Sequence, residues 1–434
     1  MRHRAALVAG ALALASLSRP TRGDFQEEES VETPPNLIEQ LWPGIGEPRA
    51  RLPSFLADTT LTLRLRTGFI EAQTVTGSER QEFAAGGWLA YRSGWLVNAL
   101  QIGATSYGAA PVYAPDGKDG RLLMPGENAY SVFGEAFAAV RFEEYALLKG
   151  YRQEVQQPYI NRADNKMTPN TFQGVTVGGT VSSVHYFAGY LTRIKPRDSD
   201  AFISMSEAAG APRTNHGVAL LGLTMKPGSA LSIEVSEQYG VNTFNTLFGR
   251  VEHVRPLGHE VQLHVGAQFS DQRAVGDALV ATTQVKTWST RHASARIAVT
   301  YQALTVKGAA SVTTSGNRIQ SPWGFYPGDL RLMQQFFYNA GEKALLAGAA
   351  YDFSRVVTPG LSAFTNLAWG AGSIDAAKRT PLGGEWEYDL TVDYQPPSIR
   401  GLSFRARSAI TDQAGIDAVG FLFRLFMNWE LSLL

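Results

Sequence analysis

Residues 421–434, FLFRLFMNWELSLL, decide the fold because large apolar residues occupy every second position from Phe421 to Leu433. The positions between them include Arg424, Asn428 and Glu430. On a helix these apolar side chains would be scattered around the surface, whereas on a strand they form one continuous stripe. A final strand with such a stripe is typical of outer-membrane β-barrels, in which lipid-facing and lumen-facing residues alternate.

The same period of two recurs upstream of the final strand, most clearly in Thr59–Ile70, Ala293–Ala303 and Glu385–Tyr394. Further strands are expected at 83–93, 94–104, 130–142, 144–152, 172–182, 184–195, 215–226, 229–240, 246–254, 259–269, 278–289, 304–314, 343–354, 360–371 and 401–411. This gives about nineteen segments, and single-chain bacterial barrels have an even number of strands. We therefore predict an all-β fold, a single antiparallel transmembrane β-barrel of 18 strands.

A water-soluble β-sandwich would also bury one face of each strand, so alternation alone does not exclude it. The number of strands and the aromatic residues near their ends favour the barrel, because such residues form girdles at the two membrane interfaces. These aromatic residues are Tyr91, Trp95, Tyr186, Tyr190, Trp369, Trp386, Tyr394 and Trp429.

Two kinds of connection are expected between the strands. Lys226-Pro227-Gly228 suits a short periplasmic turn, because Pro and Gly favour tight turns. Long polar stretches suit extracellular loops or constriction loops folded into the lumen, and they cover 105–129, 153–171, 196–214 and 315–342.

The composition fits a barrel and excludes several other classes. Charged residues make up 18% of the 434 residues and Gly occurs 43 times, and the mean hydropathy of −0.12 is too low for a helical membrane protein. The absence of Cys excludes disulfides, thiolate zinc sites and Cys nucleophiles. The formal net charge of zero gives no overall field that would attract nucleic acid.

The N-terminus predicts export. Basic residues at positions 2–4 precede an apolar run, Ala5–Leu17, which is too short to span a bilayer and has the length of a signal-peptide core. We predict a signal peptide at 1–23, with its cleavage site left open, although a buried N-terminal helix is an alternative. An acidic, Pro-rich leader is expected at 24–54 and the barrel domain at 55–434.

Alternation also predicts a basic stripe on the inner wall. Arg64 and Arg66 lie on the polar face of the first strand, and Arg405, Arg407 and Arg424 lie on the polar faces of the last two. A barrel in lipid must pair its last strand with its first, because an open edge would leave backbone groups without hydrogen bonds. The five arginines should therefore lie together and form a ladder of weak carboxylate sites along the path of a solute.

Further inward-facing basic residues are expected at Arg141, Lys149, Arg296 and Lys307. A purely structural role for the lumen arginines is the alternative, since they could pair with acids on neighbouring strands. Glu385, Glu387 and Asp389, one strand away from Arg405 and Arg407, are the expected partners.

The chain resembles the OprD-like family of substrate-selective outer-membrane channels from about residue 55 to the C-terminus. The resemblance rests on the order of short motifs, each weak alone: Phe55-Leu56-Ala57-Asp58 opening the first strand, Pro158-Tyr159-Ile160, Asp164, Pro169 to Gly174, Arg197-Asp198-Ser199, Phe202 to Met205, Ser321 to Gly328, Ala340-Gly341-Glu342, Glu385-Trp386-Glu387 and Gly401-Leu402-Ser403. It implies an 18-stranded barrel that takes up small carboxylate-bearing solutes passively along a wall of Arg and Lys. Lys166-Met167-Thr168 departs from the family pattern, which more often has Arg followed by apolar residues.

Two loops are candidates for the narrowest part of the pore. The first carries Tyr159, Arg162, Asp164 and Lys166 and is expected to fold inward, and a second with Tyr326 and Asp329 is expected to face it. An acidic patch opposite a basic wall would orient a solute that bears both charges. Alternatively, these are solvated residues of extracellular loops.

Enzyme and metal-site interpretations are weaker. His292 and Ser294 share one face of a strand, as a serine nucleophile and its base would in an outer-membrane phospholipase, but that face also carries Arg296 and so looks into the pore. Glu252-His253 and His259-Glu260 lack the repeated spacing of metal ligands. We therefore expect no enzymatic activity, no metal and no cofactor.

The predicted function is that of a porin in the outer membrane of a Gram-negative bacterium, through which small carboxylates diffuse selectively. A general, non-selective porin and an adhesion or binding barrel are the alternatives. The expected partners are carboxylate solutes, outer-membrane lipids and the barrel-assembly machinery, which would recognise the C-terminal strand. No nucleic-acid partner is expected, and the chain would be a monomer or a loose trimer.

Overall fold

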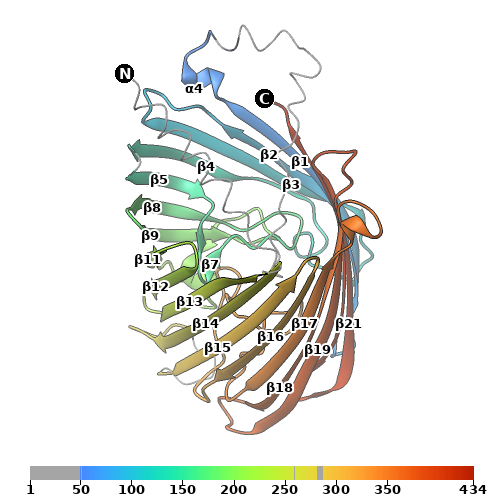
Figure 1. Cartoon of the computed structure of the whole chain (residues 1–434). Helices are drawn as coiled ribbons and strands as arrows, with labels where there is room; N and C mark the ends of the chain where they lie inside the picture. Colours follow the sequence, from blue (N-terminus) through green and yellow to red (C-terminus); the bar gives the residue numbers. More distant parts are fainter. Residues whose placement is uncertain (1–48, 50, 144, 259, 281–286) are drawn as a thin grey trace.

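The computed structural model describes residues 49, 51–143, 145–258, 260–280 and 287–434. These residues form a closed antiparallel β-barrel of 18 strands, which confirms the predicted fold class (Figure 1). Each strand pairs with its neighbour in the chain, and the barrel closes where β1 (Thr60–Gln73) pairs with β21 (Ile416–Ser432). The predicted signal peptide at 1–23 and almost all of the predicted leader at 24–54 lie outside the described residues.

The remaining barrel strands are β2 (Glu79–Arg92), β3 (Leu100–Tyr113), β4 (Tyr130–Phe142), β5 (Ala146–Gln153), β8 (Thr171–Val181), β9 (Val184–Lys195), β11 (Val218–Met225), β12 (Leu231–Gly240), β13 (Phe244–Gly258), β14 (Val261–Ala274), β15 (Ser289–Tyr301), β16 (Leu304–Thr313), β17 (Lys343–Asp352), β18 (Leu361–Ile374), β19 (Pro381–Tyr394) and β20 (Leu402–Gln413). Because β6 and β7 belong to a loop, β5 pairs directly with β8, and β9 likewise pairs with β11.

The other elements are short. They are α4 (Ser54–Ala57), α5 (Met205–Ala208), the 3-10 turn η2 (Phe353–Arg355), and the two-residue strands β6 (Gln156–Gln157), β7 (Ile160–Asn161) and β10 (Ile203–Ser204). Residues 55–58, expected to open the first strand, instead belong to α4 and its C-cap. Among the described residues, no helix is both long and apolar enough to cross a bilayer.

Two predicted strands are wrong. Residues 94–99 form a turn with positive φ at Val97 and Asn98, and β3 runs from 100 to 113 through a stretch that the sequence suggested was loop. The reason is that β3 is rich in Gly and Ala, which give little contrast between its faces. Half of the expected strand at 278–289 lies outside the described residues, and positions 278–280 and 287–288 are not strand.

The inner and outer faces of the wall follow the predicted alternation. On β21, Phe421 and Leu425 are more than 40% exposed on the outside, whereas Asn428 on the inner face is 1% exposed. The same contrast separates Leu65 from Arg66 on β1. The outer face is therefore an apolar surface of the kind that lipid covers.

The two ends of the barrel differ in the length of their connections. At one end the strands are joined by short turns, such as 182–183 between β8 and β9 and 302–303 between β15 and β16. At the other end the long connections 114–129, 154–170, 196–217 and 314–342 enter or cover the lumen. Figure 1 shows the chain around β7 lying inside the wall.

The hydrophobic core therefore lies inside the barrel, where these loops pack against one another and against the wall. One cluster joins Phe172, Leu191, Met205, Phe244 and Trp323, which come from two of the loops and three strands. A fully buried aromatic side chain contributes roughly 3–5 kcal/mol to stability. The loops are thus fixed parts of the lumen.

Candidate functional site

The main cavity of the described residues lies in the lumen and has a volume of about 730 Å³. Its walls are strands β1, β2, β20 and β21, single residues of β3, β4, β12 and β13, and the two loops 154–170 and 314–342, here called the first loop and the second loop. Nine arginines and five carboxylates line it. The arginines are Arg64, Arg66, Arg92, Arg162, Arg250, Arg331, Arg405, Arg407 and Arg424, and the acids are Glu135, Glu154, Asp164, Glu234 and Glu430.

Barrel closure gathers five of these arginines. Arg64 and Arg66 of β1 lie opposite Glu430 and Asn428 of β21, and Arg407 of β20 lies directly opposite Arg424 of β21. The three neighbouring strands thus carry Arg64, Arg66, Arg405, Arg407 and Arg424, and we call this surface the basic wall. All five side chains line the cavity.

Several of these arginines are held by polar neighbours on the wall. Arg64 Nε lies 2.9 Å from Glu430 Oε2, and Arg66 Nε donates to Asn428 Oδ1 at 2.5 Å. Arg407 Nε donates to the Thr391 hydroxyl at 3.0 Å. These contacts fix the guanidinium groups in position before any solute arrives.

Of the three acids expected to pair with Arg405 and Arg407, Asp389 interacts electrostatically with Arg407, whereas Arg405 binds an acid that was not expected. Register places Asp393 of β19 opposite Arg405, and the two side chains form an ion pair at 2.6 Å. Glu385 and Glu387 lie several residues further along β19, opposite the far end of β20, where they contact the second loop instead. Alternation gave the correct face but could not give the register.

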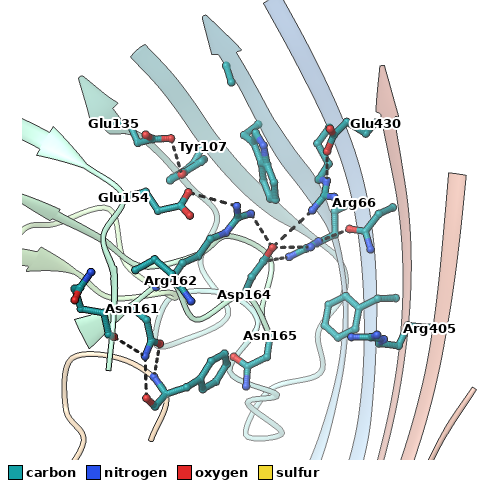
Figure 2. Close-up of a pocket in the computed structure, with 18 of the residues that line it drawn as sticks. Arg66, Tyr107, Glu135, Glu154, Asn161, Arg162, Asp164, Asn165, Arg405 and Glu430 are labelled. Carbon is teal, nitrogen blue, oxygen red and sulfur yellow. Dashed lines mark hydrogen bonds and ion pairs between the residues drawn. The ribbon is translucent and has the colours of Figure 1, made fainter. Parts of the chain in front are cut away.

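The first loop places a carboxylate on the basic wall. Asp164 bonds Arg66 through both oxygens, lies 3.7 Å from Arg64 Nη1, and accepts from Arg162 Nη2 at 2.9 Å (Figure 2). Burial alone would raise the pKa of Asp164, but the charges of Arg66 and Arg162 outweigh burial and hold that pKa well below its usual range. Asp164 is therefore ionised at any physiological pH.

Arg162 and Lys166 of the first loop also have acidic neighbours. Arg162 lies between Asp164 and Glu154, whose charges raise the pKa of Arg162 although burial opposes them. Lys166 pairs with Asp198, yet burial lowers the pKa of Lys166 to about 8. Of these two basic groups, Arg162 lines the cavity, whereas Lys166 ties the first loop to the loop 196–217.

Tyr159 anchors the first loop and does not line the cavity. Its side chain is 1% exposed, its hydroxyl donates to Ser270 Oγ of β14 at 2.6 Å, and its ring packs edge-on against Phe248 of β13. The neighbouring Asn161 exchanges two hydrogen bonds with the backbone of Phe325 in the second loop. The first loop thus bridges the lumen, from the basic wall to β13 and β14.

The second loop is held by β15. The Tyr326 hydroxyl bonds His292, and Asp329 accepts from Ser294 Oγ at 2.6 Å and lies 3.7 Å from Arg296. Tyr326 lines the cavity, whereas Asp329 is not among the residues that line it. We call strands β13, β14 and β15, which hold both loops, the anchoring wall.

The remaining predicted basic residues lie off the cavity. Arg296 pairs with Glu252 at 2.5 Å on the anchoring wall. Arg141 stacks over Trp95 at 4.3 Å and donates to the backbone of residue 98, and Lys149 lies 3.8 Å from the Phe137 ring centroid. Lys307 of β16 is not among the residues that line the cavity.

Sequence reasoning missed several cavity residues. Arg92 on β2, paired with Glu135 at 2.9 Å, and Arg250 on β13 both sit in alternating strands and could have been found. Arg331 lies in the second loop, where no periodicity marks it. Trp88 shares the inward face of β2 with Arg92 and had the same signal. Arg64, Arg66 and Arg162 lie 4.9 Å, 5.2 Å and 5.5 Å from its ring centroid.

The chain was compared with known proteins. The sequence model described as "outer membrane porin, OprD family" matches residues 53–433. A search of curated proteins found none that matches the chain.

Solved structures share the fold at low sequence identity. Pseudomonas aeruginosa OccK9 (OpdG) has a TM-score of 0.78 and 19% identity, over 88% of this chain and 100% of that one. Pseudomonas aeruginosa OpdK, solved with vanillate, has a TM-score of 0.77 and 19% identity over 87% and 100%. Acinetobacter baumannii OccAB1 has a TM-score of 0.77 and 15% identity over 89% and 99%.

The family match covers the barrel from α4 to β21. With 18 closed strands, loops folded into the lumen and this match, the chain belongs to the OprD family of porins, which are channels of the Gram-negative outer membrane.

Proposed function

We propose that the channel admits small, water-soluble carboxylates, such as amino acids and organic or aromatic acids, by passive diffusion along the basic wall. The charge of the central cavity is the main support, because nine arginines face five carboxylates there and leave an excess of four positive charges. In a narrow space with walls of low dielectric constant, that excess charge attracts an entering anion more strongly than it would in open water.

The chemistry of arginine suits this task. A guanidinium stays charged at all relevant pH values and can hold a carboxylate through two parallel hydrogen bonds. Conduction requires sites that attract the solute but release it, and a row of sites allows stepwise movement. The five arginines of the basic wall offer such a row, and the polar neighbours that already hold them keep each site weak.

The carboxylates of the cavity supply a second element of selectivity. Glu135 and Glu154 lie across the cavity from Arg405 (Figure 2). A solute with one negative and one positive group would be oriented between them. A general porin with the same barrel would lack this preference. Block of the current by added solutes therefore distinguishes a selective channel from a general porin.

The contacts of His292 and Ser294 on the inner wall do not support an enzymatic role. His292 bonds Thr313 and Tyr326, and Ser294 donates to Asp329, so each side chain holds the second loop in place. A phospholipase serine would need access to lipid, whereas Ser294 is buried on the inner face. We propose that the chain is a channel without enzymatic activity.

We further propose export by a signal peptide at 1–23 and an acidic leader at 24–54, preceding the barrel domain at 55–434. The apolar stripe of β21 would be recognised by the barrel-assembly machinery, and the exposed outer face would contact outer-membrane lipids. The folded chain would act as a monomer or within a loose trimer.

Single-channel recording in planar bilayers tests the proposal. We expect small, stable currents that carboxylates block and that amines of the same size do not. Arg405→Gln and Arg424→Gln should weaken the block, whereas Arg141→Gln, which removes an arginine away from the cavity, should leave it unchanged. If no carboxylate blocks the current, the channel is a general, non-selective porin.

A further inference from the structure

Strand β19 holds the second loop through a column of buried acids. Both oxygens of Glu387 accept hydrogen bonds from the backbone N–H groups of Met333, Gln334 and Gln335, at 2.5–3.1 Å. Glu387 is 0% exposed. These contacts fix the segment that follows Arg331, so the position of one cavity wall depends on them.

A second contact lies further along β19, where Glu385 meets Glu342 at the end of the second loop. Asn339 joins them, since its backbone N–H donates to Glu342 Oε2 at 2.8 Å and its side-chain amide donates to Glu385 Oε2 at 3.0 Å. The carboxyls of Glu342 and Glu385 lie within hydrogen-bonding reach of each other and are 0% and 1% exposed.

One oxygen of each carboxyl group in this pair lacks a hydrogen bond. Oε1 of Glu342 and Oε1 of Glu385 are both buried, and neither accepts a hydrogen bond from the described residues. Two ionised carboxylates in contact would repel each other, and burial would amplify the repulsion. A proton between them removes one charge and supplies the missing hydrogen bond.

We propose that Glu342 and Glu385 share one proton and act as a latch that holds the second loop inside the lumen and releases it as the pH rises. This inference goes beyond the proposed transport function and does not depend on the identity of the solute. It also gives a role to two motifs, Ala340-Gly341-Glu342 and Glu385-Trp386-Glu387, that the basic wall leaves unexplained.

The surroundings of the pair favour the protonated state. Asp412 of β20 adds a negative charge that favours protonation, whereas the hydroxyl of Ser373 on β18, which faces Glu342, opposes it. Tyr338 of the second loop lies near Glu385, and Arg318 lies near Tyr338. Burial, with the charge of Glu385 beside it, raises the pKa of Glu342 to about 9. The latch is therefore protonated at neutral pH.

Gly370 of β18 leaves the space in which Glu342 sits. A Cβ atom added to Gly370 would lie 2.1 Å from Glu342 Oε1, which is closer than any real contact. Gly370→Ala should therefore push the Glu342 carboxyl away from Glu385 and open the latch without changing a charge.

The pH dependence follows from proton linkage. The closed latch retains one proton up to about pH 9, whereas a released Glu342 would titrate near its ordinary pKa of about 4.3. Release therefore frees one proton between these values, and the equilibrium constant for opening should rise about tenfold per pH unit. Above about pH 9 the rise should level off.

Hydrogen exchange of the full-length protein in lipid vesicles tests the latch. The probe is the protection of the backbone amides of Met333–Gln335, obtained by dividing the intrinsic exchange rate by the observed rate. In the wild type, protection should fall about a hundredfold from pH 6 to pH 8. In Glu342→Gln protection should stay constant, because the amide donates a hydrogen bond to Glu385 at every pH.

Two further variants keep the test decisive. Glu385→Gln should also remove the pH dependence, and Glu207→Gln, at an exposed position in another loop, should retain the wild-type slope. Protection that is flat in the wild type, or a slope that survives in Glu342→Gln, would overturn the proposal. Restoration of protection at pH 8 by millimolar Ca²⁺ would also overturn it, since the pair would then be a cation site.

Discussion

The basic wall and the anchoring wall are built by the same alternation of residues, yet only the first opens onto the cavity along its length. On β1, β20 and β21 the inward arginines line the cavity. On β14 and β15, Ser270, His292, Ser294 and Arg296 also point inward, but they bind the side chains of the two loops.

The difference shows that the face of a strand does not by itself determine the role of a residue. A loop that covers a wall converts its polar side chains from solute contacts into structural contacts. The anchoring wall should therefore control the shape and stability of the pore, and the basic wall should control which solutes it binds.

Removal of the main anchor should give the largest effect. Tyr159→Ala deletes a fully buried aromatic side chain, which typically costs about 3–5 kcal/mol. The first loop should then detach from Phe248, and the channel should show larger and noisier currents with less selectivity. Urea unfolding in vesicles and single-channel recording measure both effects. Tyr159→Phe, which loses only the bond to Ser270, should cost about 1 kcal/mol.

Arg66 joins the two regions, because it lies on the basic wall and binds the first loop. Arg66→Gln should lower the unfolding free energy by about 1–3 kcal/mol, since Asp164 loses its bidentate hydrogen bonds from the Arg66 guanidinium. Arg66→Lys keeps the positive charge but cannot form the bidentate hydrogen bonds to Asp164. It should therefore recover the anion preference of the pore without recovering its stability, and equal recovery of both would break the distinction between the walls.

The basic wall alone should affect solute block more than stability. Arg407→Gln removes one cavity charge next to Arg424 and should weaken carboxylate block by roughly two- to fivefold, as expected for the loss of about 0.5–1 kcal/mol from one of several weak ion contacts. The matched change where the second loop contacts the anchoring wall, Asp329→Asn, should lower the unfolding free energy while leaving block nearly unchanged. If titrations of the current show that Asp329→Asn weakens carboxylate block more than Arg407→Gln does, the two walls do not have the separate roles described above.

A pH-dependent effect on stability should come from Lys166. Its pKa is about 8 in the folded state and about 10.4 in the unfolded chain, so the unfolded chain binds more protons between these values. This residue should therefore make the fold more stable as the pH rises from 8 to about 10. Comparing urea unfolding of the wild type with Lys166→Met isolates the contribution, and identical pH profiles would exclude it.

The barrel was predictable from sequence because each wall strand exposes one face to lipid. The apolar stripe of β21, the strand number and the pairing of β21 with β1 all follow from alternation and from the need to close the sheet. Strand β3 was placed wrongly because its Gly and Ala residues carry little hydrophobic contrast.

The cavity was predictable only in part. Alternation put Arg64 and Arg405 on the inner face, and both line the cavity. It could not tell that Tyr159 would be buried or that Asp164 would bind Arg66, because those contacts join residues about a hundred positions apart or more through loops without periodicity. Register was also hidden, so Asp393 was not recognised as the partner of Arg405.

The reversal potential in a salt gradient tests the central claim most directly. Wild-type channels between two KCl concentrations should prefer chloride, and Arg405→Gln combined with Arg407→Gln should shift the potential toward potassium. Arg141→Gln removes a charge of the same kind away from the cavity and should leave the potential unchanged. If the wild type prefers potassium, or if Arg141→Gln shifts the potential as far as the double variant does, then the basic wall does not determine what the channel admits.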